Sequence, residues 1–190
     1  MTFTETAING AFIIEVHQIK DDRGFFGRSF CQKEFERFGL NGNMVQTNVS
    51  SNPKSGTLRG LHMQVSPFSE AKLVRCTKGS VFDVMVDMRV DSPTFKKWFG
   101  IELTEENFRM LYIPEGCAHG YLTLQDKSDV TYQVSQYYTP AAERGFLWND
   151  PAFEIAWPIA PELISVKDQS HPLFESETYN QSAEVQITLG

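Results

Sequence analysis

Hydrophobic and polar residues alternate with a period of two through the middle of the chain, from Met44 to about residue 138. Alternation of this kind is typical of β-strands that bury one face. It predicts strands near residues 44–51, 57–64, 72–78, 80–88, 98–103, 109–113, 118–124 and 130–138. Because so many short strands follow one another, we expect an all-β fold, either a β-barrel or a jelly roll.

The segment from Ser80 to Met88 shows the alternation most clearly. Its apolar residues share one face, whereas Asp83 and Asp87 lie on the other. The dipeptide Gly79-Ser80 precedes this strand and indicates a hairpin turn from the strand before it.

Fewer elements are predicted outside this region. A strand is expected at residues 12–17, a turn at 21–24 and a second strand after that turn. Residues 32–39 place two phenylalanines three positions apart and end in glycine, the pattern of a short amphipathic helix. From Ala141 onward the pattern is irregular, and we expect loops that cap the barrel.

Two tyrosines share the parity of the apolar residues in the strand predicted at 130–138. Tyr132 and Tyr138 are therefore both expected to point inward. As core aromatics they would need buried partners for their hydroxyls. In the mouth of a barrel, a phenol is instead a candidate general acid. The alternation alone does not choose between these two interpretations.

Length and composition are those of an ordinary globular protein. A chain of 190 residues with 41% hydrophobic and 22% charged residues predicts one domain spanning residues 1–190. A formal net charge of -7 does not supply the basic face that binding to nucleic acid needs. Cationic residues nevertheless gather in the first half, which is compatible with a small anionic ligand: Arg23, Arg28, Arg59, Lys72, Arg75 and Lys78.

Cysteine usage and hydropathy bear on the cellular compartment. The three cysteines, Cys31, Cys76 and Cys117, are far apart and form no Cys-x-x-Cys pair, so we expect reduced thiols. No secretory leader is recognisable at the N-terminus, and no apolar run approaches the roughly 20 residues that span a bilayer. We therefore expect a cytoplasmic protein that does not associate with membranes.

Candidate chemistry centres on residues 56–72, where Arg59, His62 and Lys72 lie in a segment predicted to be sheet. A titratable imidazole beside two cations suits a pocket that binds an anion and moves a proton. A single histidine, however, is more often a hydrogen-bonded structural residue. Two features favour a site here. The segment contains two glycines, which mark a bulge or a close backbone approach, and a second histidine recurs at His119.

One candidate function is that of a metal-dependent cupin. Two stretches resemble the cupin motifs, the first through Gly56, His62, Gln64, Glu70 and Gly79 and the second through Pro114, Gly116 and His119. The first motif normally has a second histidine at the position of Gln64, and an amide is a poor ligand beside imidazoles. We therefore expect the fold of a cupin without a bound metal.

A metal-free alternative needs a base, an orienting carboxylate, a cation for a developing oxyanion and an acid on another strand. His62 can be the base, and Asp168 can fix its tautomer. Lys72 can stabilise negative charge on oxygen, and Tyr132 can return a proton. Such a set suits proton abstraction next to a carbonyl, the chemistry of racemases and epimerases.

The chain also resembles a known family, the dTDP-4-dehydrorhamnose 3,5-epimerases of deoxysugar biosynthesis, from about Phe12 to Pro172. The resemblance is carried by Asp-Arg-Gly-Phe-Phe at 22–26, Gly-x-Leu-Arg-Gly-Leu-His at 56–62, Lys-Leu-Val-Arg at 72–75, Phe-Asp-Val at 82–84, Asp-Ser-Pro-Thr-Phe at 91–95, Ile-Pro-Glu-Gly-x-Ala-His-Gly at 113–120, Tyr-Tyr-x-Pro at 137–140, Glu-Arg-Gly at 143–145 and Asn-Asp-Pro at 149–151.

This resemblance implies a cupin-type jelly roll with a few short helices, without metal or other cofactor, and a homodimer with exchanged N-terminal strands. The implied substrate is a nucleotide-linked 4-keto-6-deoxyhexose, with dTDP-4-dehydro-6-deoxyglucose converted to dTDP-4-dehydrorhamnose. The implied catalytic residues are His62 as base, Asp168 as its partner, Lys72 as enolate-stabilising cation and Tyr132 as acid. Positions that line the substrate and nucleotide site match Arg23, Gln46, Asn48, Arg59, His119, Tyr138, Glu143 and Lys167.

One feature of strand geometry has to be reconciled with these roles. Arg59 and His62 have opposite strand parity, so both can contact one ligand only if Gly60 introduces a bulge, which we expect.

The chain departs from the family pattern at two positions. Arg28 replaces a usual glutamate and Thr47 a usual aspartate, which leaves the nucleotide base and the exact sugar open. Inversion of one or of both carbons C3 and C5 also stays open. Two other functions remain as alternatives, a metal-dependent cupin oxygenase or isomerase and a non-catalytic sugar-nucleotide binding module. Binding alone would not require a base and an acid together.

Overall fold

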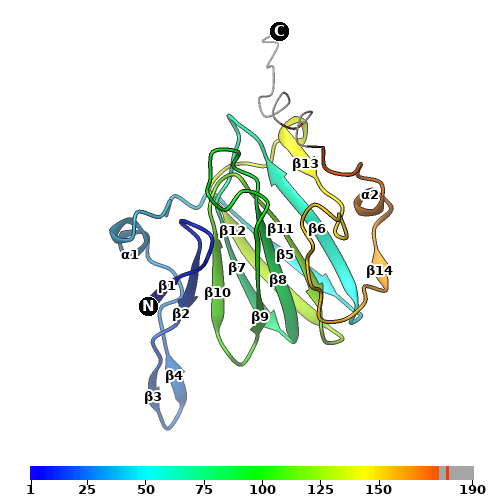
Figure 1. The fold of residues 1–190 in the computed structure, drawn as a ribbon. Helices are drawn as coiled ribbons and strands as arrows, with labels where there is room; N and C mark the ends of the chain where they lie inside the picture. Colours follow the sequence, from blue (N-terminus) through cyan, green and yellow to red (C-terminus); the bar gives the residue numbers. More distant parts are fainter. Residues whose placement is uncertain (176–178, 180–190) are drawn as a thin grey trace.

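The computed structural model describes residues 1–175 and residue 179. This part of the chain forms two large sheets that pack face to face, with a hairpin near the N-terminus that extends away from them (Figure 1). The arrangement confirms the expected jelly roll with short helices.

Each large sheet has six strands. The first has the order β1-β2-β10-β7-β12-β5, and the second has the order β13-β6-β11-β8-β9 with β14 parallel beside β6. The strands of the first sheet are β1 (Thr2–Glu5), β2 (Phe12–Glu15), β5 (Gln46–Asn52), β7 (Lys72–Lys78), β10 (Arg109–Ile113) and β12 (Ser128–Val134). Those of the second are β6 (Thr57–Gln64), β8 (Ser80–Asp87), β9 (Trp98–Thr104), β11 (Cys117–Thr123), β13 (Glu143–Gly145) and β14 (Leu163–Ile164).

β1, β13 and β14 were not predicted, and two further strand features differ from the sequence prediction. β7 and β8 belong to different sheets, so the turn between them at Gly79 is a corner and not the expected hairpin. β12 ends at Val134, whose partners Gln46 and Lys72 are the first residues of β5 and β7. The strand predicted up to residue 138 therefore ends four residues early. Tyr138 consequently lies outside the strand, where the alternation no longer applies. It is 56% exposed, so the predicted inward orientation is wrong.

The N-terminal segment combines an arm with a packed helix. The arm is the hairpin of β3 (Ile19–Asp21) and β4 (Gly24–Phe26), drawn in blue in Figure 1. Helix α1 (Gln32–Arg37) confirms the predicted amphipathic helix and buries Phe35 against Tyr112 of the first sheet. No helix among the described residues is long and apolar enough to cross a membrane.

The main core lies between the two sheets. It contains Val74, Cys76, Leu111, Ile113 and Val130 from the first sheet and Val81, Met85, Leu103, Cys117 and Tyr121 from the second. Complete burial of an aliphatic side chain of this size stabilises the fold by about 1.5–3 kcal/mol. The alternating apolar positions therefore account for the face-to-face packing.

The loops from Ala141 onward cover the outer face of the second sheet, as expected for a cap. Phe146 and Phe153 from these loops pack with Val86 and Met88 at the end of β8. The segment also contains a short 3-10 helix, η1 (Pro140–Ala142), and helix α2 (Val166–Gln169), neither of which the irregular pattern predicted.

β8 is buried on both faces because the cap covers its apolar side. Asp83 and Asp87 lie on the other side, which points into the protein, and both are fully buried. A buried carboxylate is unfavourable unless hydrogen bonds or a counter-charge compensate for the lost water. The two aspartates meet this requirement differently, Asp87 in a structural network and Asp83 through a hydrogen bond with His119.

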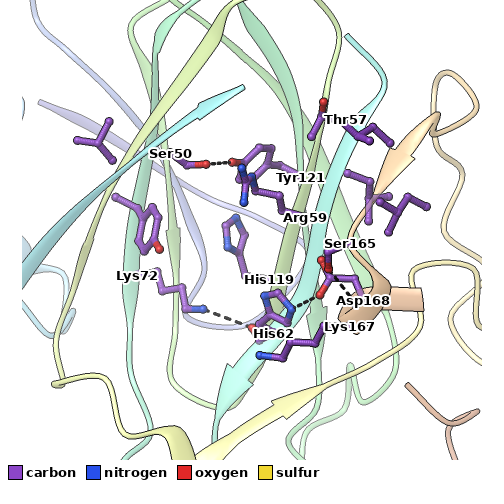
Figure 2. Close-up of a pocket in the computed structure, with 15 residues that line it drawn as sticks. Ser50, Thr57, Arg59, His62, Lys72, His119, Tyr121, Ser165, Lys167 and Asp168 are labelled. Atoms are coloured by element: carbon purple, nitrogen blue, oxygen red, sulfur yellow. Dashed lines mark hydrogen bonds and ion pairs between the residues drawn. The ribbon is translucent and has the colours of Figure 1, made fainter. Parts of the chain in front are cut away.

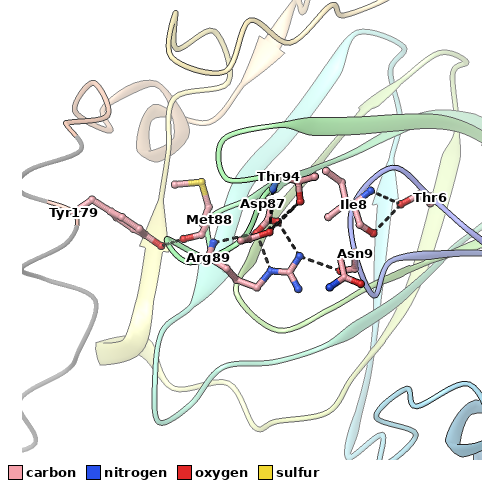
Figure 3. Close-up of polar contacts among 9 residues, drawn as sticks. Thr6, Ile8, Asn9, Asp87, Met88, Arg89, Thr94 and Tyr179 are labelled. Atoms are coloured by element: carbon pink, nitrogen blue, oxygen red, sulfur yellow. Dashed lines mark hydrogen bonds and ion pairs between the residues drawn. The ribbon is translucent and has the colours of Figure 1, made fainter.

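The carboxylate of Asp87 organises the loop that follows β8 (Figure 3). Arg89 donates to it from Nε at 2.8 Å and from the backbone amide at 3.0 Å. The hydroxyls of Ser92 and Thr94 each donate to it at 2.6 Å. The guanidinium of Arg89 also donates to the carbonyl of Asn9 at 3.0 Å, so the network joins this loop to the N-terminal segment.

We predict that Asp87→Asn lowers the free energy of unfolding by about 2–3 kcal/mol, since charge-assisted hydrogen bonds contribute about 1.5–3 kcal/mol each. Burial alone would raise the pKa of the Asp87 carboxyl, but the hydrogen bonds from Arg89, Ser92 and Thr94 lower it overall. A lowered folded-state pKa means that the stabilisation is present above the unfolded value and disappears as the pH falls through the folded one.

Denaturant titration of the wild type and the variant at several pH values measures this difference. We expect it to be constant near neutral pH and to shrink below about pH 4. Asp91→Asn, on the same loop but exposed, is the matched control and should leave the midpoint unchanged. A stability difference that grew on acidification would contradict the assigned role of Asp87.

Candidate active site

A cavity of about 560 Å³ opens between the sheets, bordered on one side by β14 and α2. A second cavity of about 340 Å³ adjoins it and shares His62, Lys72 and Tyr132 as lining residues. Arg59, His119, Lys167 and Asp168 line the first cavity, and Gln46, Asn48, Tyr138 and Glu143 line the second. The fold thus brings together every predicted site residue except Arg23.

His62 and Asp168 form a hydrogen-bonded pair, with Nε2 of the ring 2.7 Å from Oδ1 of the carboxylate (Figure 2). Because a carboxylate accepts, Nε2 carries the hydrogen and the neutral ring keeps its lone pair on Nδ1. Burial raises the pKa of Asp168, but hydrogen bonds from His62, Gly60 and Ser165 together bring it below its ordinary value. Asp168 is therefore suited to orient the ring of a histidine base.

Two backbone features hold Asp168 in place. The side chain of Ser165 caps the first turn of α2 by accepting from the backbone amide of Asp168 at 3.0 Å. The amide of Gly60 donates to Oδ2 of Asp168 at 3.3 Å. Strand β6 and helix α2, which are far apart in the sequence, thus position the two members of the pair together.

The predicted bulge at Gly60 is confirmed. Across β6 and β11, His62 pairs with His119 and Arg59 pairs with Tyr121, so β6 has one residue more than its partner between these pairs. Gly60 has a φ of 117°, and a Cβ there would lie 2.6 Å from Cα of Gly120. Only glycine fits this conformation and spacing, and the extra residue turns Arg59 and His62 into the same cavity.

The ammonium of Lys72 is buried and held by two oxygens. Nζ lies 3.1 Å from Oε1 of Glu70 and donates to the carbonyl of His62 at 3.3 Å. Gln64 donates to the other Glu70 oxygen at 3.3 Å. From the sequence, Glu70 was expected only as a possible cupin metal ligand. Its position two residues before Lys72 was the available signal for an ion pair.

The side-chain amide of Gln64 binds the backbone of two neighbouring loops and is not free to bind a metal. Its amide oxygen accepts from the backbone of Thr139 at 2.6 Å, and its nitrogen donates to the carbonyls of Phe68 and Tyr137 at 3.0 and 3.2 Å. Both ends of the amide are therefore engaged. In metal-binding cupins the residue at this position is a metal ligand. Here it is an amide engaged in other hydrogen bonds, which argues against a metal-dependent cupin site.

A second imidazole–carboxylate pair joins His119, which lines the first cavity, to the buried Asp83. Nε2 of His119 is 2.8 Å from Oδ1 of Asp83, and the other Asp83 oxygen has no hydrogen-bond partner within the described part of the chain. Asp83 was expected on the face opposite the apolar residues of its strand, and no role was predicted for it. Because that face turned out to be the interior, its carboxylate became the partner of His119.

Arg59 belongs to a hydrogen-bonded chain along the cavity wall. Its Nε donates to Asn52 at 2.8 Å, and Asn52 donates to the hydroxyl of Tyr121 at 3.3 Å. Tyr121 in turn donates to Ser50 at 2.7 Å (Figure 2). These contacts fix the direction of Arg59 without neutralising it, which leaves its charge for an anionic ligand.

Tyr132 packs against the main core with its ring and lines both cavities. Burial, with smaller contributions from Tyr121 and Glu70, raises its pKa, so the phenol is protonated at neutral pH. Among residues 1–175 and 179, no side chain or carbonyl forms a hydrogen bond with its hydroxyl. The structure therefore places a protonated phenol at the cavity and not against a buried polar partner.

The rim of the second cavity is formed by a cluster around Glu143. Lys167 lies 2.6 Å from Oε2 of Glu143, and the hydroxyl of Tyr138 donates to the same oxygen at 3.1 Å. Burial raises the pKa of Glu143, yet these two hydrogen bonds lower it overall. Gln46 joins the cluster by accepting from the backbone amide of Tyr138 at 3.0 Å.

Arg23 lies apart from this site. It sits on the tip of the β3–β4 arm, where its side chain is 89% exposed and pairs with Asp21 at 2.6 Å. It lines neither cavity of its own chain.

The site has the parts for proton transfer and anion binding. It presents a histidine base with an orienting carboxylate, a buried ammonium, a protonated phenol and a free guanidinium. Within the described part of the chain, the group of metal-ligating side chains that lie close enough to share an ion is His62, Asp168 and His171, which includes the base pair itself.

The chain is similar to known proteins over most of its length. The family model described as dTDP-4-dehydrorhamnose 3,5-epimerase matches residues 5–176. The dTDP-4-dehydrorhamnose 3,5-epimerase of Shigella flexneri is 45% identical over 180 residues, which cover 94% of this chain and 99% of that protein.

Two solved structures are similar over nearly their whole length. The Bacillus anthracis dTDP-4-dehydrorhamnose 3,5-epimerase with TDP and PPi bound has a TM-score of 0.87 at 42% identity, covering 91% of this chain and 99% of that one. A Legionella pneumophila dTDP-6-deoxy-D-glucose-3,5-epimerase in complex with dTDP-4-keto-L-rhamnose has a TM-score of 0.84 at 40% identity, covering 90% and 92%. The chain therefore belongs to the dTDP-4-dehydrorhamnose 3,5-epimerase family, whose members are isomerases.

Proposed function

We propose that this protein inverts C3 and C5 of dTDP-4-dehydro-6-deoxyglucose to give dTDP-4-dehydrorhamnose. The observation that supports this most strongly is the His62–Asp168 pair in a cavity that also contains Lys72 and Tyr132. A binding module would need neither the base pair nor the protonated phenol. The relatives with TDP or a dTDP-sugar bound support the substrate class.

The proposed reaction proceeds through an enolate. The C4 ketone acidifies the hydrogens at C3 and C5, and Nδ1 of His62 removes one of them while Asp168 stabilises the imidazolium. Lys72 stabilises the negative charge that develops on the C4 oxygen. Tyr132 then donates a proton to the opposite face of the same carbon, which inverts it. No cofactor takes part in these steps.

Other residues of the two cavities bind the substrate. Arg59 offers a charge not used in an ion pair within the described chain, which suits the pyrophosphate. Lys167 and Glu143 at the rim, with Tyr138, suit the polar sugar and nucleotide edges. Gln46, Asn48 and His119 complete the proposed set of contacts.

We further propose a cytoplasmic homodimer in which the β3–β4 arms are exchanged. Ile19 and Phe26 on the arm are 61% and 75% exposed, an unfavourable amount for apolar side chains of a monomer. Val49 on the edge strand β5, at the cavity, is 71% exposed. An arm from a second copy laid along this edge would cover such residues and bring the partner's Arg23 to the cavity.

The experiment that tests the proposed function is NMR of dTDP-4-dehydro-6-deoxyglucose in deuterated water. We expect the wild type to incorporate deuterium at C3 and C5, and His62→Ala to lose incorporation at both carbons by about 10²–10⁴-fold. His119→Ala is the comparison, since it should chiefly raise KM. Equal loss of exchange in the two variants at saturating substrate would remove His62 from the role of base.

Tyr132→Phe keeps the ring and removes only the hydroxyl. We predict that this variant still exchanges deuterium through His62 but inverts far more slowly, because protons return to the original face. Little stability should be lost, since the hydroxyl has no partner in the described structure. If the hydroxyl were structural instead, the melting midpoint would fall by the equivalent of about 1–3 kcal/mol while the ratio of exchange to inversion stayed normal.

Arm exchange can be tested by mixing two inactive variants. We predict that co-expression of His62→Ala with Arg23→Ala restores activity, because the cavity of the Arg23→Ala subunit keeps its own His62 and receives Arg23 from the partner subunit. Half of the dimers are mixed and each has one intact site, so about a quarter of wild-type activity is expected. If each cavity used its own arm, the mixture would show no gain over the separate variants.

A further inference from the structure

We propose that His62, Asp168 and His171 together form a binding site for a divalent transition metal such as Zn²⁺, and that metal bound there inhibits the enzyme. Each of these three side chains offers one ligand atom, a ring nitrogen or a carboxylate oxygen, and the three atoms lie within 4.8 Å of one another. His62 and Asp168 already have catalytic roles in the proposed function, whereas His171 has none.

His171 is built into the site without an evident structural partner. It follows α2 directly, and its ring centroid lies 6.2 Å from that of His62, with the planes at 80°. Its Nε2 is buried and has no hydrogen-bond partner among residues 1–175 and 179. A buried imidazole nitrogen without a partner is unfavourable, and a metal ion would satisfy it.

Gly145 makes room for the His171 ring. This residue lies opposite His62 in the β13–β6 pairing, and a Cβ at position 145 would overlap Nε2 of His171. The absence of a side chain at position 145 therefore lets the second imidazole approach the first. Gly145 also offers a way to displace the ring without removing it.

The donor set has the right chemistry for zinc. Two imidazoles and one carboxylate are a common set of protein ligands for Zn²⁺, with water in the remaining position, and the cavity is open to water. An imidazole binds a metal in its neutral form, and burial, with a smaller contribution from the nearby His62, lowers the pKa of His171 in that direction.

The present geometry needs a modest adjustment to close around an ion. Metal–nitrogen bonds of about 2.0–2.1 Å in a tetrahedron separate the ligand atoms by roughly 3.3 Å. His62 and Asp168, now 2.7 Å apart, must therefore open slightly, and His171 must move toward them. The ammonium of Lys167 is already paired with Glu143 at 2.6 Å, which limits its repulsion of a cation.

Inhibition follows from which nitrogen the metal takes. On Nε2 of His62 the ion replaces the proton that is shared with Asp168, and that proton is released to solvent. An imidazole bonded to a dication is a much weaker base at Nδ1, so proton abstraction stops. This part of the inference rests on the proposed function, whereas metal binding itself does not.

The test titrates chelator-treated protein with Co²⁺, whose visible absorption reports nitrogen and oxygen coordination, and then displaces it with Zn²⁺. We expect one ion per chain. His171→Ala should weaken binding by more than about 100-fold, since outer-shell partners alone are worth about 10- to 100-fold. Gly145→Ala should weaken it as well, by displacing the ring. His17→Ala, at an exposed histidine, is the matched control and should bind like the wild type.

The same samples are then assayed for deuterium exchange with and without Zn²⁺. We expect Zn²⁺ to inhibit the wild type and His17→Ala, chelator to restore activity, and His171→Ala to be insensitive relative to its own metal-free rate. Unchanged Co²⁺ affinity in both His171→Ala and Gly145→Ala would overturn the site, and binding without inhibition would overturn its effect. If metal-free wild type showed no exchange, the proposed function would fail while the Co²⁺ titration still decided the site.

Discussion

The contact between Gly60 on β6 and Gly120 on β11 is the constraint on which the site depends. A Cβ at Gly60 would lie 2.6 Å from Cα of Gly120, and a Cβ at Gly120 would lie 2.7 Å from the carbonyl oxygen of Arg59. The bulge at this contact turns Arg59 and His62 toward one cavity. It also aims the amide of Gly60 at Asp168. One local irregularity therefore positions the proposed base, its carboxylate partner and the guanidinium proposed to bind the anionic part of the substrate.

The ionisable side chains of the cavity are arranged mostly in pairs. Lys72 is paired with Glu70, and Lys167 with Glu143. Pairing of this kind holds each group in one direction and lets charges lie close together away from bulk water. Arg59 differs, because its nearest partner is the neutral amide of Asn52. The cavity consequently keeps one positive charge uncompensated, which matches the anionic class of ligand expected for the family.

Several parts of this picture could be predicted from the sequence. The period-two alternation located most strands, because the buried core between the sheets requires an apolar residue at every second position. Gly60 indicated the bulge, because Arg59 and His62 could share a ligand only if the parity changed between them. The resemblance of the motifs to the family also singled out His62, Lys72, Tyr132 and Asp168, which the structure places around one cavity; their catalytic roles are part of the proposed function.

Only the tertiary structure decided which strands pair and which side chains from distant segments come into contact. Alternation does not say which sheet a strand joins, so the corner at Gly79 and the end of β12 before Tyr138 depended on neighbouring strands. The alternation also does not say which face of a strand is covered. The C-terminal loops cover the apolar face of β8, and Asp83 lies on the opposite face, in the interior. The approach of His171 to His62 likewise arises between segments far apart in the chain. The sequence by itself determined which functional side chains each segment contains. The tertiary structure determined which of them come into contact, because a contact between distant segments does not change the pattern of hydrophobic and polar residues within either segment.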